Sequence, residues 1–181
     1  MRLFIGIPLA DAVVAELAAI SARLRSTAGG LRWSAPASWH ITLQFLGNAS
    51  PEQYNCLTAR LGELRSPPVP IHLAELGVFD RAGIFYACVE LTSPLISLQK
   101  RVEAATALCG FQPESRGFHP HITLARCKGQ SHTRQLTRLL ARERLQPRFT
   151  PFAAQEFLLY ESHLRAGGSE YEVRVRFRLG G

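Results

Sequence analysis

The chain has 181 residues and a formal net charge of +7; 46% of its residues are hydrophobic and 19% are charged. This length and composition are typical of one globular domain and exclude a disordered or fibrous chain. No apolar run approaches the roughly 20 residues that a membrane span requires, so we expect no membrane contact. The positive charge favours a polyanionic partner such as nucleic acid or a phosphorylated metabolite.

The first half of the chain alternates predicted strands and helices. An apolar run closed by Pro8 predicts a strand, and Asp11 is the expected N-cap of the helix that follows. Ser50-Pro51-Glu52-Gln53 has the pattern of a capping box with proline at the first helical position. The expected elements are a strand at 3–7, a helix at 13–24, a loop at 31–39, a strand at 40–46 and a helix ending near residue 64.

The second half repeats this mixture. Two strands joined by the turn Asp80-Arg81-Ala82-Gly83 predict a hairpin. Ser93-Pro94 again has the pattern of a capped helix start, and the apolar residues that follow have helical spacing up to Gly110. The expected elements are strands at 71–79 and 84–91, a helix from 93, a strand at 121–125, a basic helix at 133–145, and strands at 155–164 and 171–179 joined around Gly167 and Gly168.

The four cysteines form no C-x-x-C pair, and several lie among apolar residues. Buried thiols of this kind are usually reduced. Disulfides are rare in reducing compartments, so we expect free thiols and a cytoplasmic protein. The apolar run at the N-terminus is too short for a secretory signal, which agrees with this expectation.

The tetrapeptide His-Ile-Thr-Leu occurs twice, at residues 40–43 and 121–124. In each half an apolar strand precedes a helix, then a turn-rich loop, then the His-x-Thr strand. This matching order predicts two internally related halves within a single domain that spans residues 1–181. A duplication of this kind would bring the two motifs together about a pseudo-two-fold axis.

The repeated motif carries the groups that phosphodiester cleavage needs. Side chains alternate along a strand, so His40 and Thr42 share one face, as do His121 and Thr123. One imidazole accepts a proton from water and the other donates one to the leaving alkoxide. The threonine hydroxyls hydrogen-bond the non-bridging phosphate oxygens. This scheme requires neither a metal nor a cofactor.

The chain resembles the RNA 2′,3′-cyclic phosphodiesterases of the two-histidine phosphoesterase superfamily, also described as 2′-5′ RNA ligase-like proteins. The resemblance extends over essentially the whole chain. It is carried by the segments RLFIGIP at 2–8, HITLQFLG at 40–47, LGVF at 76–79, FHPHITLAR at 118–126 and LYES at 159–162.

The resemblance implies an α+β bilobal fold of two antiparallel sheets with outer helices and a central cleft. It also implies that His40 is the proton donor to the leaving 3′ oxygen, that His121 is the proton acceptor, and that the product is an RNA 2′-phosphate. Arg126 matches a candidate phosphate ligand. Strict alternation places Arg126 on the face opposite His121, so it reaches the phosphate only if the strand bends. His119 is a departure, because relatives often carry arginine there.

Several alternatives remain open. The two motif histidines could be core residues, and His119 with His121 has the spacing of two zinc ligands, although acidic and cysteine partners are lacking nearby. The arginines at 174, 176 and 178 alternate with apolar residues, as on a solvated sheet face or an RNA-binding surface. Trp33 and Phe118 are candidates for stacking on a nucleobase, whereas Phe45 is expected in the core on the face of Ile41 and Leu43.

The expected partner is RNA with 2′,3′-cyclic phosphate ends, with transfer RNA fragments and small cyclic nucleotides as candidate forms, and the protein is expected to be a monomer. Two other activities are compatible with the same residues. One is ATP-independent 2′-5′ ligation, which is the reverse chemistry in the same site. The other is a basic module that binds RNA ends without cleaving them.

Overall fold

The computed structural model describes residues 1–115, 117–127, 129–143, 147–165 and 168–180. The helices are interspersed among the strands along the chain, and no cis peptide bond occurs among the described residues. The elements are β1 (Arg2–Pro8), α1 (Asp11–Arg25), β2 (Leu31–Trp33), a 3-10 helix (Pro36–Ser38), β3 (His40–Asn48), α2 (Pro51–Gly62), β4 (Val69–Ile71), β5 (Leu73–Phe79), β6 (Ile84–Val89), α3 (Ser93–Ala107), β7 (His121–Cys127), α4 (Gln130–Glu143), β8 (Phe152–Ala154), β9 (Glu156–Arg165) and β10 (Gly168–Arg178).

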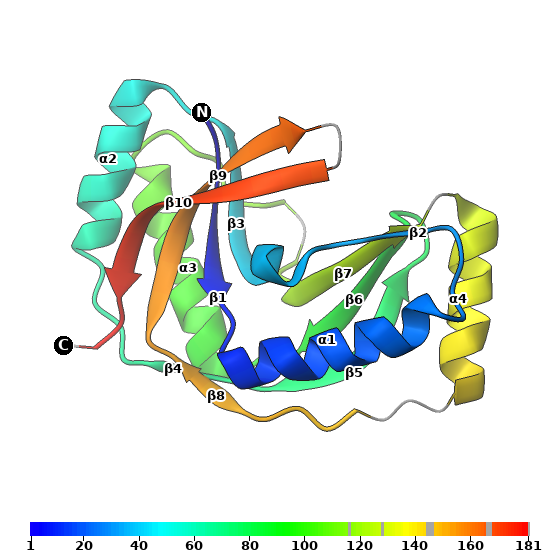
Figure 1. Cartoon of the computed structure of the whole chain (residues 1–181). Helices are drawn as coiled ribbons and strands as arrows, with labels where there is room; N and C mark the ends of the chain where they lie inside the picture. Colours follow the sequence, from blue (N-terminus) through cyan, green and yellow to red (C-terminus); the bar gives the residue numbers. More distant parts are fainter. Residues whose placement is uncertain (116, 128, 144–146, 166–167, 181) are drawn as a thin grey trace.

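The strands form two four-stranded sheets, which are the two lobes seen in Figure 1. The first sheet has the order β10-β9-β1-β3 and the second has the order β2-β7-β6-β5, while β4 and β8 form a separate ribbon. Every pairing is antiparallel. This confirms the predicted α+β class with two antiparallel sheets. Strands β3 and β7, which carry the repeated motif, contact each other across the boundary between the lobes.

Each sheet pairs its His-x-Thr strand with the apolar strand that begins the same half. β3 pairs with β1, and β7 pairs with β6. This correspondence supports the two internally related halves. The duplication itself stays a prediction.

The helices cross between the halves. α1 follows β1 of the first sheet, yet it lies beside the second sheet with α4, whereas α3 follows β6 of the second sheet and contacts β3 and α2 of the first lobe (Figure 1). Apolar residues of both lobes form one continuous hydrophobic cluster, in which Ile5, Leu17, Phe85 and Leu95 are fully buried. None of the described helices is long and apolar enough to span a bilayer.

Two of the predicted helix starts are displaced by one residue. Ala10 is the N-cap of α1 and makes no side-chain capping bond, so Asp11 is the first helical residue rather than the cap. A carboxylate in the first turn still interacts favourably with the helix dipole. Thr92 caps α3, because its hydroxyl accepts a hydrogen bond from Leu95 N–H at 3.4 Å, where Ser93 was expected to do so.

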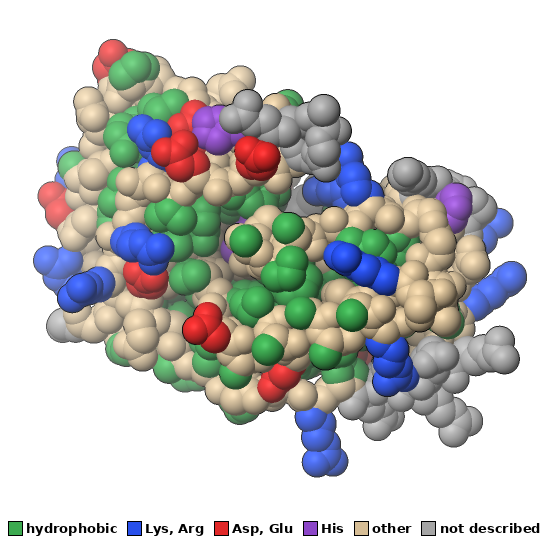
Figure 2. All heavy atoms as spheres, in the orientation of Figure 1, with side chains coloured by type: hydrophobic (Ala, Val, Ile, Leu, Met, Phe, Trp, Pro, Cys, Tyr) green, Lys and Arg blue, Asp and Glu red, His purple; other side chains and the backbone are tan. Residues whose placement is uncertain are grey.

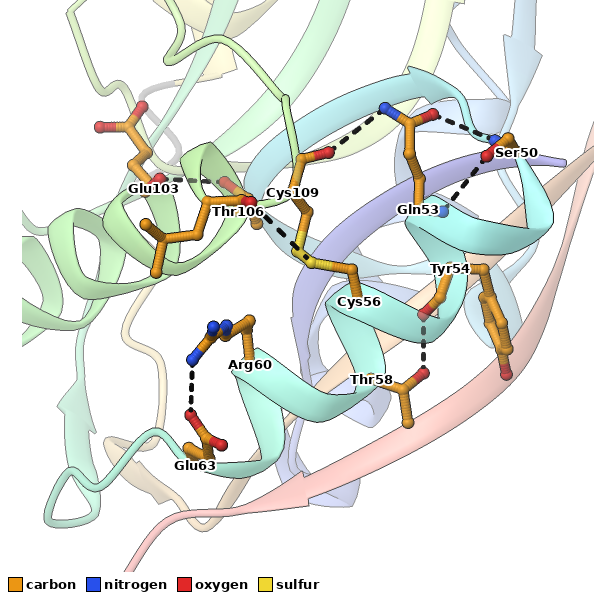
Figure 3. Close-up of a disulfide and its surroundings, with 11 residues drawn as sticks. Ser50, Gln53, Tyr54, Cys56, Thr58, Arg60, Glu63, Glu103, Thr106 and Cys109 are labelled. Carbon is orange, nitrogen blue, oxygen red and sulfur yellow. Dashed lines mark hydrogen bonds and ion pairs between the residues drawn. A yellow bond between two sulfur atoms is a disulfide. The ribbon is translucent and has the colours of Figure 1, made fainter.

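The capping box of α2 is confirmed. The Ser50 hydroxyl accepts from Gln53 N–H, and the Gln53 side chain accepts from Ser50 N–H (Figure 3).

The sequence did not predict β2, β4 or β8. Each of these strands is three residues long, too short to show a period of two, and each exists because a distant strand supplies its hydrogen bonds. The expected loop at 31–39 therefore contains β2, which pairs with β7, and a 3-10 helix. The expected strand at 71–79 is divided, with β4 paired to β8 and β5 paired to β6. The predicted end of α4 at residue 145 and the residue Gly167 lie outside the described residues.

The prediction of four reduced thiols is wrong for one pair. Cys56 on α2 and Cys109, just after α3, form a disulfide (Figure 3), whereas Cys88 and Cys127 are free. The Gln53 amide also donates to the Cys109 carbonyl oxygen, at 3.3 Å, so the two helices are joined at two points. The sequence could not reveal this pairing, because only the packing of α2 on α3 brings these cysteines together.

Candidate active site

The two repeated motifs meet in one small cavity between the lobes. His40 and Thr42 of β3 and His121 and Thr123 of β7 all line a cavity of about 160 Å³. Among the described residues, those that line this cavity include Arg126 but no aspartate or glutamate. Its charge and size therefore suit a single phosphate group. Figure 2 shows the molecule hollowed between the two lobes, with Lys and Arg side chains at the rim.

A β-bulge follows the threonine of each motif. In the first sheet Gly6 pairs with Thr42 but Ile5 pairs with Gln44, and in the second Tyr86 pairs with Thr123 but Phe85 pairs with Ala125. One extra residue therefore enters each motif strand and reverses the alternation beyond it.

The bulge decides which face Arg126 occupies. In each motif strand the two consecutive residues at the bulge are both buried. The next residue, which is Phe45 in β3 and Arg126 in β7, is exposed on the histidine face. The objection that alternation directs Arg126 away from His121 is thereby removed. For Phe45 the same geometry overturns the core prediction, because its side chain is 62% exposed and lines the cavity.

Both imidazole rings are held by the same local hydrogen bond. The Nδ1 atom of His40 lies 2.8 Å from the Ser38 carbonyl oxygen, and Nδ1 of His121 lies 2.7 Å from the His119 carbonyl oxygen. A carbonyl oxygen only accepts, so Nδ1 carries the hydrogen in each ring. The neutral tautomer then leaves Nε2 as an acceptor, so each ring can take up one proton at that atom.

Each imidazole also packs against a stacked pair of aromatic rings. Phe4 and Tyr160 stack with centroids 4.8 Å apart beside His40, and Phe79 and Tyr86 stack at 4.1 Å beside His121. Close packing at His40 requires a glycine at position 6. A Cβ atom there would lie 3.0 Å from the Ile41 carbonyl oxygen and 3.2 Å from Cδ2 of His40.

This packing shifts the proton affinity of both rings in the same direction. Burial lowers the pKa of His40 from 6.5 to about 4; its bond to Ser38 opposes the shift, and the charge of His121 adds to it. Burial is also the largest cause lowering the pKa of His121, with smaller contributions from His119 and Arg126. Both rings are therefore mainly neutral at pH 7 in the free protein. The acid and base pair that the sequence predicts requires one of the two rings to be protonated, which is not its main state in the free protein.

Two larger cavities open from the central one. We call the first the polar arm, a cavity of about 610 Å³ lined by Arg32, Trp33, Ser34, Ala35, Ala37, Ser38, Arg126, Ser169, Glu170 and Tyr171. We call the second the aromatic arm, a cavity of about 590 Å³ whose lining includes Phe45, Phe79, Phe118, His119 and Arg81. Arg126 lines both arms and the central cavity. The site is therefore an extended cleft with the two histidines at its middle.

Comparison with known proteins identifies the family. The model of the 2′-5′ RNA ligase superfamily matches residues 10–162. The chain belongs to this superfamily. It is 30% identical to the RNA 2′,3′-cyclic phosphodiesterase of Escherichia coli over 77% of this chain and 75% of that protein. It is 28% identical to the RNA 2′,3′-cyclic phosphodiesterase of Bacillus subtilis over 97% of this chain and 95% of that one.

Solved structures agree with this membership. Escherichia coli LigT in its apo form superposes with a TM-score of 0.80 at 26% identity, covering 99% of this chain and 98% of LigT. The complex of LigT with 3′-AMP superposes equally well. The bilobal two-histidine phosphoesterase fold implied by the sequence is therefore confirmed.

The aromatic residues that are candidates for stacking on a nucleobase have different surroundings. Phe118 lines the aromatic arm and is half-buried. Trp33 lines the polar arm, but the Arg25 guanidinium lies 5.3 Å from its ring centroid and Phe85 packs against it edge-on at 5.9 Å. The Tyr160 ring packs against His40 and is only 8% exposed. Phe45, which sequence reasoning placed in the core, is the most exposed of these rings.

Two of the three arginines of β10 are paired with glutamates. Arg174 contacts Glu161 at 3.6 Å and Glu172 at 3.1 Å, and Arg176 contacts Glu156 at 2.6 Å. The RNA-binding reading of this strand is therefore weakened, and the solvated sheet face is favoured.

The candidate metal ligands do not gather at the motif histidines. The described His, Cys, Asp and Glu residues form one group of three close enough to share an ion: Glu161, His163 and Glu172. It lies on β9 and β10, where Arg174 already pairs with both glutamates. Within the described residues, His119 and His121 belong to no such group, so the zinc alternative gains no support.

The residues that sequence reasoning missed include Phe45, Arg2, Arg32 and Tyr171, which line the cleft. If the alignment of the two repeats is extended beyond Gln44 and Ala125, Phe45 and Arg126 occupy equivalent positions. Arg2 lies in the segment RLFIGIP but was not singled out, and no sequence signal marked Arg32 or Tyr171, because they come from strands that only the fold brings to the motif.

Proposed function

We propose that this protein hydrolyses RNA 2′,3′-cyclic phosphodiester ends to 2′-phosphomonoesters. The observation that carries the proposal is the pair of histidines on one phosphate-sized cavity, each with Nδ1 bound to a carbonyl oxygen and Nε2 left as the acceptor; no acidic side chain of the described residues lines this cavity. The relatives named RNA 2′,3′-cyclic phosphodiesterase support the reaction, and the superfamily supports the roles of the two residues.

The proton acceptor in this mechanism is His121. Its Nε2 takes a proton from water while the water oxygen forms a bond to phosphorus. The bond from phosphorus to the 3′ oxygen breaks, and His40 donates a proton from Nε2 to that oxygen. The phosphate stays on the 2′ oxygen. General acid and base groups each contribute about 10² to 10⁴ in rate.

Substrate binding favours the protonated form of His40, which takes its proton from solvent. With a pKa of about 4 the free residue is mainly neutral. A cyclic phosphate carries a negative charge, and an opposite charge within a few ångströms favours the charged imidazole. The incoming substrate therefore raises the pKa of the proton donor and prepares it for the reaction.

The remaining groups of the central cavity hold the phosphate. Thr42 and Thr123 hydroxyls donate hydrogen bonds to the non-bridging oxygens, and the Arg126 guanidinium, which lines the same cavity, neutralises their charge. The aromatic arm takes the nucleobase of the terminal nucleotide, with Phe45 and Phe118 as stacking surfaces. Trp33 is a weaker stacking surface because Arg25 covers one of its faces.

The test is hydrolysis of a short RNA ending in a 2′,3′-cyclic phosphate, in the presence of EDTA, with the 2′- and 3′-phosphate products resolved between pH 5 and 9. We expect the 2′-phosphate alone. Turnover that EDTA abolishes and zinc restores would contradict the proposed mechanism. Salt-sensitive RNA binding without turnover would support the binding module instead.

The pH profile of this reaction checks the role of substrate binding. We expect kcat/KM, which reports the free enzyme, to be highest below pH 6.5, because both imidazole pKa values are lowered. The alkaline limb of kcat should lie at higher pH, because bound phosphate raises the pKa of His40. Coincident limbs would show that the phosphate does not charge His40.

Ligation of RNA ends is a second candidate, favoured by the near-symmetry of the two imidazoles. Both rings have the same tautomer and the same kind of carbonyl partner. In ligation a 5′-hydroxyl takes the place of water: His121 takes its proton, its oxygen bonds to phosphorus, the bond to the 3′ oxygen breaks, and His40 protonates that oxygen. Cleavage of the resulting 2′-5′ linkage is the reverse reaction, in which the two histidines exchange the roles of acid and base. Incubating matched RNA ends with the enzyme at high RNA concentration, and analysing for a 2′-5′ linkage, tests this direction.

We also propose that the protein acts as a monomer in the cytoplasm, on RNA fragments such as those of transfer RNA. Both motif histidines and both motif threonines come from one chain, so a second copy is not needed to complete the site. The Cys56–Cys109 disulfide is unusual in reducing compartments. The thiol state of these two cysteines in cells therefore tests the location, and light scattering tests the oligomeric state.

A further inference from the structure

Two arginines lie directly opposite each other at the boundary between the central cavity and the polar arm. Arg32 of β2 pairs with Arg126 of β7 in antiparallel register, so their side chains share one sheet face. Like charges directly opposite in a sheet are destabilising. Neither residue has an ion-pair partner within the described part of the chain. The pair therefore favours a bound anion that would relieve the repulsion.

The polar arm is continuous with the cavity that holds the reacting phosphate. Both cavities are lined by Ser34, Ser38, Ser169, Tyr171 and Arg126, but Arg32 lines the polar arm alone. A volume of about 610 Å³ is within the range of small-molecule sites and accommodates one nucleotide.

The polar arm also contains one carboxylate, that of Glu170. This residue already has an interaction of its own. The serine hydroxyls and the two guanidinium groups outnumber it, so the arm retains the character of a phosphate-binding surface.

We propose that Arg32 forms a second phosphate subsite, which binds the phosphodiester on the 5′ side of the terminal nucleotide. This inference rests on the proposed function and makes it more specific. The preferred substrate is then an RNA strand of two or more nucleotides rather than a mononucleotide 2′,3′-cyclic phosphate.

The spacing of the two arginines agrees with this assignment. Directly opposed residues in antiparallel strands have Cβ atoms about 5 Å apart, and long side chains diverge from that distance. Arg126 lines the central cavity, where the proposed function places the reacting phosphate, whereas Arg32 lines the polar arm, so Arg32 is positioned for the next phosphate along the strand.

The other arm suits the base better than the backbone. Its lining includes three phenylalanine rings, of which Phe45 is largely exposed, whereas the Arg25 guanidinium covers the tryptophan of the polar arm. The RNA strand therefore enters through the polar arm and places its last base in the aromatic arm.

The experiment compares three substrates that share the same terminal nucleotide: a mononucleotide 2′,3′-cyclic phosphate, the dinucleotide ending in that group, and the same dinucleotide with a neutral methylphosphonate linkage. Wild-type enzyme should have the highest kcat/KM on the charged dinucleotide. Arg32→Ala should lower kcat/KM for the charged dinucleotide about three- to tenfold more than for the other two at low salt. Arg60→Ala, an exposed arginine on α2 paired with Glu63, is the matched control and should leave the substrate ratios unchanged.

Two results would overturn the subsite. One is an equal loss on all three substrates, which would place Arg32 at the reacting phosphate. The other is no loss on any of them. If the wild-type enzyme hydrolyses none of the substrates, the proposed function fails instead. The subsite is then judged by calorimetric binding of the dinucleotide 2′-phosphate, which Arg32→Ala should weaken relative to the mononucleotide 2′-phosphate.

Discussion

The motif strands β3 and β7 have the same backbone geometry but carry different side chains where the substrate must be oriented. Both place a histidine and a threonine on the cavity, both fix the imidazole through the carbonyl oxygen two residues earlier, and both have a bulge after the threonine. Beyond the bulge one strand presents Phe45 and the other Arg126. The equivalent histidines serve proton transfer. The different residues beyond the bulge, Phe45 and Arg126, suit a substrate that has a base on one side and phosphates on the other.

The equivalence of the two histidines is tested by removing each in turn. His40→Ala and His121→Ala should each lower kcat by about 10² to 10⁴, because each removes one proton-transfer group. The circular dichroism spectrum should stay that of the wild type. His163→Ala, which changes a histidine paired with Glu172 on the sheet surface, serves as the control and should retain activity. Activity near the wild-type level in both single variants would refute the two-histidine mechanism.

The difference beyond the bulge is tested by a pair of variants. Arg126→Ala should lower kcat by about 10² to 10³, because the guanidinium stabilises charge that develops on the phosphate. Phe45→Ala should mainly raise KM, by about tenfold, because stacking on the base stabilises the bound substrate and the transition state equally. If both variants change kcat and KM in the same proportion, the division of labour between the two strands is wrong.

The two imidazoles also differ in burial, and the stability of the protein in acid tests this difference. His40 is neutral when folded down to a pH of about 4, whereas an unfolded histidine binds a proton near pH 6.5. Acid therefore favours the unfolded chain, and the stabilisation present above pH 6.5 is lost as the pH falls toward 4. The loss is about 3 kcal/mol at most.

Urea unfolding of wild type, His40→Gln and His121→Gln at pH 7 and pH 4.5 measures this contribution. The His40 variant should lose less stability on acidification than the wild type. The His121 variant should differ less from the wild type in its pH dependence than the His40 variant does, because the ring of His121 is more exposed than that of His40. An identical pH dependence in all three proteins would contradict the burial argument.

The parts of the site that sequence analysis predicted are those encoded within one strand. His40, Thr42, His121 and Thr123 follow from a repeated tetrapeptide and the alternation of a strand, and the structure brings them to one cavity. The failures arise where the backbone departs from regularity. Phe45 was assigned to the core because the bulge after Thr42 leaves no signal in a single strand.

The same limit applies to longer-range features of the fold. The three-residue strands and the Cys56–Cys109 disulfide depend on partners far away in the chain. Sequence reasoning about local patterns has no access to such contacts, and the cysteine spacing alone favoured reduced thiols.

The exchange of α1 and α3 between the lobes has a consequence for how such a protein arises. A half-length chain with one His-x-Thr strand would leave its helix without a sheet of its own to cover. Two copies that exchanged helices would bury both hydrophobic faces and bring two identical histidines together on the axis between them. The predicted duplication would correspond to such a domain-swapped homodimer joined into one polypeptide. In a joined chain each half can change separately, and Phe45 and Arg126 are the position at which the two motif strands differ beyond the bulge.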